Sequence, residues 1–202
     1  MAVSKEHGGV FLIQLALKTG LMLPGSRWLF LGNQRVKEMG RIISVKPMME
    51  MFGAEVILVD VNDKDYSVVH DLRTPFPDSY VCSFDVMANF GTSEHVIQRA
   101  IGRPLSGQHQ CFANAHNAAK PGGLYLHAVP HAGGCVRHGS SKYSVPWFAD
   151  LAKNNLYEVL HLDTVEVPHD IPGDNRYVVC AMRRPKRIAP FNSAAWVDPP
   201  SA

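Results

Sequence analysis

Two short runs of exclusively apolar residues constrain the fold of this chain most strongly. Residues 28–31 read WLFL and residues 56–59 read VILV, and Gly32 and Asp60 end them at once. An apolar run of this length is typical of a buried parallel strand, because both faces of such a strand are covered. The two runs therefore indicate a parallel sheet with structure packed on both sides.

Further strand-like and helix-like segments alternate along the chain. We expect strands at residues 66–69, 84–88, 124–129, 157–162 and 177–182, and helices at 47–52, 93–101, 108–119 and 145–155. No helix separates the last two strands, which implies one antiparallel edge strand. The pattern predicts an α/β fold: a doubly wound, seven-stranded, mostly parallel sheet with an antiparallel last strand.

The length of 202 residues suits one domain, with an N-terminal helix over 1–23 and a C-terminal tail over 184–202. The apolar segment 8–24 is too short and too polar to span a bilayer. A net charge of +2 does not argue for nucleic acid or an acidic membrane. The four cysteines form no C-x-x-C pair, which favours free thiols in a reducing, cytoplasmic compartment.

Polar side chains gather in the stretch 84–96, FDVMANFGTSEHV. It reads as a strand followed by Phe90 and Gly91 and then by a helix that starts at Thr92 or Ser93. In open α/β sheets, ligands bind where strands give way to helices. We therefore expect the ligand site here. The segment KPGG at residues 120–123 is expected to end the preceding helix and to form a turn before the next strand.

Five stretches taken together resemble the class I S-adenosylmethionine-dependent methyltransferases, which have a Rossmann-like fold. They are WLFLGNQ, VILVD, HDLRTPFP, FDVMANFGTSEHV and KPGGLYLHAVP. The resemblance covers residues 28–183, and the segment HGSSKYSVPWFADLAKNNLYEV is similar to uncharacterised bacterial members. The sequence departs from the family pattern in the first motif, G-x-G-x-G, of which only Gly32 is present. An extra loop at 35–46 is expected to follow this motif.

The resemblance implies S-adenosylmethionine as cofactor and S-adenosylhomocysteine as product. In this family, Asp60 would bind the ribose, Asp71 would hydrogen-bond the adenine amino group, and Leu72 would flank the ring. The cofactor set that the motifs imply is Gly32, Asn33, Gln34, Asp60, Val61, Asp71, Leu72, Asn89, Phe90 and Gly91. A sulfonium cofactor carries no phosphate, which agrees with a sequence that has no P-loop motif.

Histidines and their neighbours supply candidates for the acceptor side. A neutral imidazole can accept a proton near pH 7, so we name His95, His138 and Glu94 as catalytic candidates. For the substrate pocket we name His127, His131, Tyr143 and Trp147. The alternative is that these histidines are hydrogen-bonded loop residues that only shape the pocket.

Three hypotheses follow for function. The first is methyl transfer to a small-molecule or carbohydrate-like acceptor, without nucleic acid or membrane as partner and with the oligomeric state open. The second is a non-catalytic or partner-dependent binding or scaffold protein, motivated by the missing glycines. The third is a metal-dependent enzyme in which Glu94, His127 and His131 bind the ion, although we expect no metal.

Overall fold

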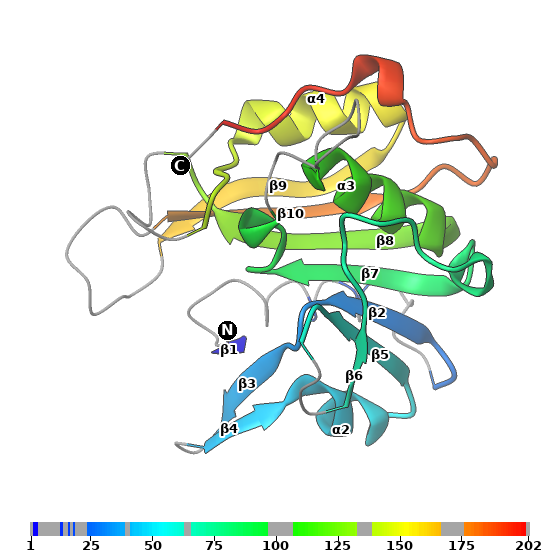
Figure 1. Ribbon diagram of the computed structural model, residues 1–202, viewed down its shortest axis with the longest axis vertical. Helices are drawn as coiled ribbons and strands as arrows, with labels where there is room; N and C mark the ends of the chain where they lie inside the picture. Colours follow the sequence, from blue (N-terminus) through cyan, green and yellow to red (C-terminus); the bar gives the residue numbers. More distant parts are fainter. Residues whose placement is uncertain are drawn as a thin grey trace.

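A seven-stranded sheet runs through the molecule, with strand order β6-β5-β2-β7-β8-β10-β9 (Figure 1). The computed structural model describes residues 2–3, 13, 16, 18, 24–38, 41–62, 66–96, 107–132, 139–166 and 176–200. The strands are β2 (Arg27–Leu31), β5 (Glu55–Asp60), β6 (Ser67–Val69), β7 (Phe84–Phe90), β8 (Ala119–Pro130), β9 (Glu158–Glu166) and β10 (Arg176–Arg183).

Four strand pairs in this sheet are parallel, and the last strand is antiparallel to both of its neighbours. The predicted fold class is therefore confirmed. The antiparallel strand β10 lies between β8 and β9, so the edge of the sheet is β9 rather than the last strand of the sequence.

Both faces of the sheet are covered, which explains the apolar run in β2. Leu29 and Leu31 point into a core shared with α3 (Gly107–Ala118) and α4 (Val145–Asn155). Trp28 and Phe30 point into the opposite core, shared with α2 (Val45–Glu50). Because side chains alternate along a strand, a strand between two cores needs apolar residues at every position.

Helix α4 agrees with its sequence prediction at both ends. The hydroxyl of Ser144 accepts a hydrogen bond from the backbone N–H of Trp147, and Pro146 lies in the first turn. Such a cap satisfies an N–H that would otherwise lack a partner within the helix. The helix ends at Leu156, which has a left-handed conformation with φ of 58°.

A second, three-stranded sheet stands where we expected an extra loop. It has the order β1-β3-β4, with β1 (Ala2–Val3), β3 (Arg35–Glu38) and β4 (Arg41–Ser44). The loop prediction for residues 35–46 is therefore corrected: residues 35–38 and 41–44 form two antiparallel strands, and residues 45–46 begin α2. The helix predicted over 1–23 is also corrected at its start, because Ala2–Val3 pairs with β3. Within the rest of that segment, Ile13, Ala16 and Lys18 are described, and they are helical.

Two other predicted boundaries differ from the structure, and a third prediction lies outside the described residues. The helix expected from residue 93 starts as a 3-10 helix, η3 (Ser93–His95), and residues 97–101 lie outside the described residues. Residues 120–123, predicted as a turn, belong to β8. Gly122 keeps a positive φ of 81° within that strand. The connection expected at 168–175 lies outside the described part of the chain.

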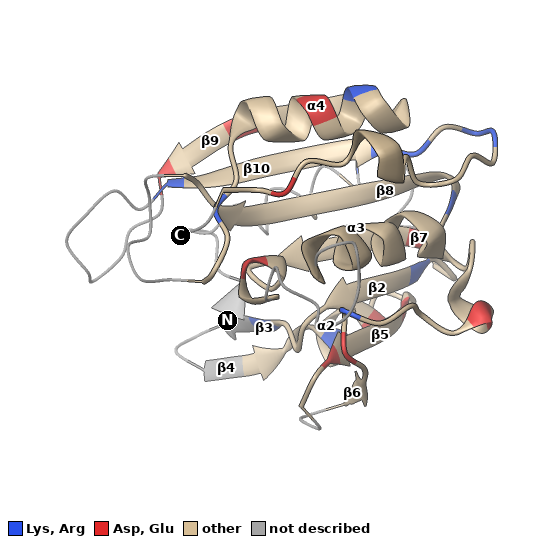
Figure 2. Cartoon of the chain, turned by 45° about the horizontal axis from the view of Figure 1, so that its top comes forward, with Lys and Arg blue, Asp and Glu red and all other residues tan. Residues whose placement is uncertain are grey.

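Charged residues are spread over several elements of the described chain. Figure 2 shows lysine and arginine positions interspersed with aspartate and glutamate positions. No helix among the described residues is long and apolar enough to cross a membrane.

Candidate functional site

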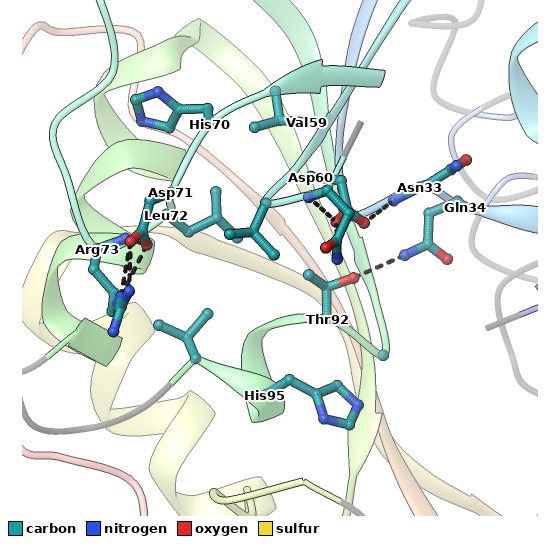
Figure 3. Close-up of a pocket in the computed structure, with 15 residues that line it drawn as sticks. Asn33, Gln34, Val59, Asp60, His70, Asp71, Leu72, Arg73, Thr92 and His95 are labelled. Carbon is teal, nitrogen blue, oxygen red and sulfur yellow. Dashed lines mark hydrogen bonds and ion pairs between the residues drawn. The ribbon is translucent and has the colours of Figure 1, made fainter. Parts of the chain in front are cut away.

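A cavity of about 640 Å³ lies where four neighbouring parallel strands end (Figure 3). Each of β2, β5, β6 and β7 contributes the residues that directly follow it. This is the edge at which open α/β sheets bind ligands. The described lining residues are Gly32, Asn33, Gln34, Val59, Asp60, Val61, Asn62, His70, Asp71, Leu72, Arg73, Gly91, Thr92, His95 and Val96.

Gly32 allows the chain to turn at the end of β2. Its φ is +83°, a conformation that glycine adopts without the steric cost of a Cβ atom. A Cβ atom at this position would lie 2.2 Å from Oγ1 of Thr92, which is far inside van der Waals contact. The single glycine that remains of the first motif therefore stands where backbone geometry and a close neighbour both require it.

Polar side chains occupy the positions where the family that the sequence resembles has further glycines. Nε2 of Gln34 donates to the carbonyl of Leu31 at 3.0 Å and to Oγ1 of Thr92 at 2.9 Å. Oγ1 of Thr92 in turn donates to the carbonyl of Leu31 at 2.7 Å. The two bonds that involve Thr92 join the end of β2 to the segment after β7, and the third holds Gln34 against Leu31. Side-chain hydrogen bonds thus hold this part of the cavity wall, where the family motif has a glycine-rich turn.

Asp60 ends β5 and points its carboxylate into the cavity (Figure 3). Oδ2 accepts from the backbone N–H of Asn33 at 2.9 Å. Oδ1 accepts from the backbone N–H of Asn62 at 2.9 Å and from its side-chain amide at 3.3 Å. A carboxylate has about four acceptor positions. Asp60 therefore holds two loops of the cavity and keeps acceptor capacity for a ligand hydroxyl.

Asp71 is engaged by Arg73 on the other side of the cavity. The guanidinium of Arg73 donates to both carboxylate oxygens, with its terminal nitrogen 2.6 Å from Oδ2, and the backbone N–H of Arg73 donates to Oδ1. Hydrogen bonds from Arg73 lower the pKa of Asp71 and raise the pKa of Arg73. An adenine amino group would have to compete with Arg73 for this carboxylate, which the sequence did not reveal.

A short turn after β7 brings an imidazole to the cavity. His95 lines the cavity, and its side chain is 52% exposed. Glu94 is fully buried, and its Oε1 lies 3.8 Å from Nε2 of His95. The backbone N–H groups of Ser140 and Ser141 donate to the carbonyl of Glu94, which fixes this turn from the opposite side.

Two residues of the predicted cofactor set lie behind the cavity wall. Asn89 is buried, and its amide donates to Ser93 Oγ at 2.7 Å and to Nδ1 of His127 at 3.2 Å. Phe90 is buried in the core on the α2 side of the sheet. Neither is among the described lining residues, because alternate residues of β7 point into the two cores. The other eight members of the set line the cavity.

The structure places the predicted substrate residues away from the cavity. His127 is buried and stacks on Phe112, and burial lowers its pKa to about 3. Tyr143 is buried, with its hydroxyl 2.7 Å from Ser93 Oγ. Trp147 packs against Trp196 of the C-terminal tail and donates to the carbonyl of Val197.

Two further histidine predictions have different outcomes. His131 pairs with Tyr143 in an isolated β-bridge, and it is not among the described residues that line the cavity. His138, a catalytic candidate, lies outside the described residues.

Sequence reasoning missed six residues that line the cavity. They are Val59, Asn62, His70, Arg73, Thr92 and Val96. Most of them lie within three residues of a strand end or of a predicted site residue. Applying the strand-end rule to every predicted strand, and not only to the motif positions, would have found Asn62, His70 and Thr92.

The three residues considered as metal ligands do not come together. Among the described residues there is no group of three or more His, Cys, Asp or Glu side chains that could hold a metal ion. Glu94 contacts His95, whereas His127 contacts Asn89 within the core. The geometry therefore gives no support to the metal-dependent hypothesis in the described part of the chain.

Comparison with known proteins identifies the fold. A methyltransferase from Methanosarcina mazei, described as S-adenosylmethionine-dependent, matches with a TM-score of 0.57 and 9% identity over 85% of this chain and 98% of that one. The N-methyltransferase NodS from Bradyrhizobium japonicum matches with a TM-score of 0.55 and 12% identity over 88% and 94%. At these identities the likeness establishes the fold alone: this chain has the Rossmann-like fold of the class I methyltransferases.

Other solved structures with this fold include a polyamine synthase and a further N-methyltransferase. The branched-chain polyamine synthase from Thermus thermophilus, in complex with N4-aminopropylspermidine and 5′-methylthioadenosine, has a TM-score of 0.52 and 16% identity over 90% of this chain and 58% of that one. Phosphoethanolamine N-methyltransferase 2 from Haemonchus contortus has a TM-score of 0.55 and 14% identity over 87% and 53%. No family model and no curated protein matches the sequence.

Proposed function

We propose that the protein binds S-adenosylmethionine in the cavity and transfers its methyl group to a small-molecule acceptor. The observation that carries this proposal is the pair Asp60 and Asp71, which follow neighbouring strands and line one cavity. Among the described lining residues the only Lys or Arg is Arg73, and it is paired with Asp71. A cavity with two carboxylates and one paired guanidinium favours a ligand that carries positive charge and no phosphate groups.

The residues present fit the cofactor. Asp60 has acceptor capacity for a ribose hydroxyl, as a carboxylate at the tip of the second strand has in dinucleotide-binding relatives. Val61 and Leu72 supply apolar surface for an adenine ring between the two carboxylates. Gly32 and Gly91 leave backbone exposed to the cavity on the side of β2 and β7, where the amino-acid arm would lie.

The bound cofactor would supply an electrophilic methyl group on a sulfonium, and this chain's residues would orient the reactants and accept a proton. Alignment of two reactants can contribute roughly 7–11 kcal/mol. We assign His95 as the base that takes the proton from the acceptor's nucleophilic atom, since its imidazole lines the cavity and is half exposed. Glu94 is buried behind it, with Oε1 3.8 Å from Nε2 of His95, and places a carboxyl group beside the ring.

A small-molecule or carbohydrate-like acceptor is the class we propose. Two proteins of the same fold are described with small amines, N4-aminopropylspermidine and phosphomonomethylethanolamine. The charges of the described chain are spread over several elements, whereas nucleic-acid binding commonly uses a basic face. Free thiols at Cys82, Cys111 and Cys180 agree with the reducing, cytoplasmic compartment that we propose.

Calorimetric titration of the purified protein with S-adenosylhomocysteine tests the proposal. We expect saturable binding with one site per chain and competition by S-adenosylmethionine. 5′-Methylthioadenosine, which lacks the amino-acid arm, should bind more weakly. Absence of any binding heat and of any thermal shift with all three ligands would contradict the proposal and would favour a non-catalytic scaffold role.

A further inference from the structure

Gln108 contacts both ends of the turn that carries His95. Its side-chain nitrogen Nε2 donates to the carbonyl of Ser93 and, at 2.8 Å, to the carbonyl of Val96. Ser93 is the first residue of η3, and Val96 follows its last residue, His95. One amide group in α3 thus spans the whole turn with its two hydrogens.

The orientation of this amide is fixed by a second buried residue. The hydroxyl of Tyr143 donates to Oε1 of Gln108 at 2.8 Å, and Oγ of Ser93 lies 2.7 Å from the same hydroxyl. Burial raises the pKa of Tyr143 well above its ordinary value, so the hydroxyl keeps its proton. With Oε1 occupied as acceptor, Nε2 of Gln108 must face the turn.

Neither residue touches the cavity, and both are buried. Gln108 and Tyr143 are each 0% exposed, and neither is among the described lining residues. A buried polar network in which the hydrogen bonds are made rigidifies the groups that it joins. The segment that it joins here ends in His95 and Val96, which do line the cavity.

We infer that Gln108 is a positioning residue for His95, with Tyr143 holding its amide in the working orientation. The inference rests on the proposed function, in which His95 accepts the proton. The network sets the direction in which the backbone leaves Ser93, and therefore where the imidazole stands relative to Thr92 and the ligand. Gln108 acts through the turn, without contact with either reactant.

The test uses Gln108→Leu, which removes both donors at similar volume, with Gln110→Leu as matched control. Gln110 lies on the same helix and donates to Asn114, not to the turn. The probe is the NMR signal of the His95 ring, assigned with His95→Gln, measured without ligand. We expect Gln108→Leu to shift and broaden this signal and to lower the methyl-transfer rate about tenfold, with S-adenosylhomocysteine binding close to that of the wild type. Gln110→Leu should do neither.

Tyr143→Phe keeps the test decisive if Gln108→Leu does not fold. It removes one buried hydroxyl and should displace the same His95 signal by a smaller amount. Tyr125→Phe is its control, because Tyr125 is also buried but donates to the carbonyl of His116. An unchanged His95 signal in both network variants would overturn the inference. If the wild type does not bind S-adenosylhomocysteine, the proposed function fails, while the ligand-free signal still decides the role of Gln108.

Discussion

Oγ1 of Thr92 lies 2.9 Å from Nε2 of Gln34, and both groups bond the carbonyl of Leu31. This contact closes the gap between the end of β2 and the segment after β7. It also leaves no room for a side chain at Gly32, whose Cβ would stand 2.2 Å from Thr92 Oγ1. The side chain of Thr92 thus occupies the space beside Gly32, and only glycine fits at that position.

Gly32→Ala should destabilise the protein by about 2–4 kcal/mol in chemical unfolding, because strain at positive φ adds to a clash with Thr92. Gly25→Ala is the control for strain alone. Gly25 has a φ of +88°, but a Cβ there meets nothing within 4 Å. We expect about 1 kcal/mol for that variant. Equal losses for the two variants would contradict the role given to Thr92.

Asp60→Ala should weaken S-adenosylhomocysteine binding at least about tenfold, which corresponds to the loss of a charge-assisted hydrogen bond. Calorimetry measures the change. Asp85→Ala is the matched control, since Asp85 lies at the opposite end of β7 and pairs with Lys120 at 2.8 Å. The affinity of the Asp85→Ala variant for S-adenosylhomocysteine should equal that of the wild type. Unchanged affinity in Asp60→Ala would remove the ribose assignment.

His95→Gln should lower the methyl-transfer rate by about 10²–10⁴-fold, the usual contribution of a general base. Binding of S-adenosylhomocysteine should stay close to that of the wild type. His70→Gln provides the comparison, because His70 also lines the cavity but its Nε2 contacts the carbonyl of Thr74 at 3.2 Å. Rates are compared with a labelled methyl donor and a panel of small amines and sugars. A full rate in His95→Gln would exclude it as the base.

Stability should fall as pH falls from about 6.5 towards 3 because His127 stays neutral in the folded protein. Burial lowers its pKa from 6.5 to about 3, so in this window the unfolded chain binds more protons than the folded one. The free energy of unfolding should lose up to about 1.4 kcal/mol per pH unit from this group. Unfolding by urea at several pH values measures the slope.

His127→Leu should make that slope shallower, whatever its effect on stability at neutral pH. Some slope should remain, because burial also lowers the pKa of His116, to about 4. An identical slope in His127→Leu and the wild type would show that His127 does not contribute to the pH dependence.

Local sequence determined most strands of the seven-stranded sheet and the edge of that sheet that carries the site. Apolar runs such as residues 28–31, with Gly32 and Asp60 at strand ends, predicted buried parallel strands and most of the cavity lining. The reason is physical: a strand covered on both faces must be apolar throughout, and a ligand must meet the chain where the strand ends. That residues 1–202 form a single domain stays a prediction from the sequence.

Tertiary structure alone decided which polar residues face the cavity and which are buried. His127, Tyr143 and Asn89 were predicted to bind ligands, yet they form buried contacts, because sheet pairing and α3 turn them inward. Asp71 is engaged by Arg73, and Gln108 reaches the turn of His95 from another helix. Such contacts depend on side-chain direction across elements that are distant in the chain, which spacing along a sequence does not encode.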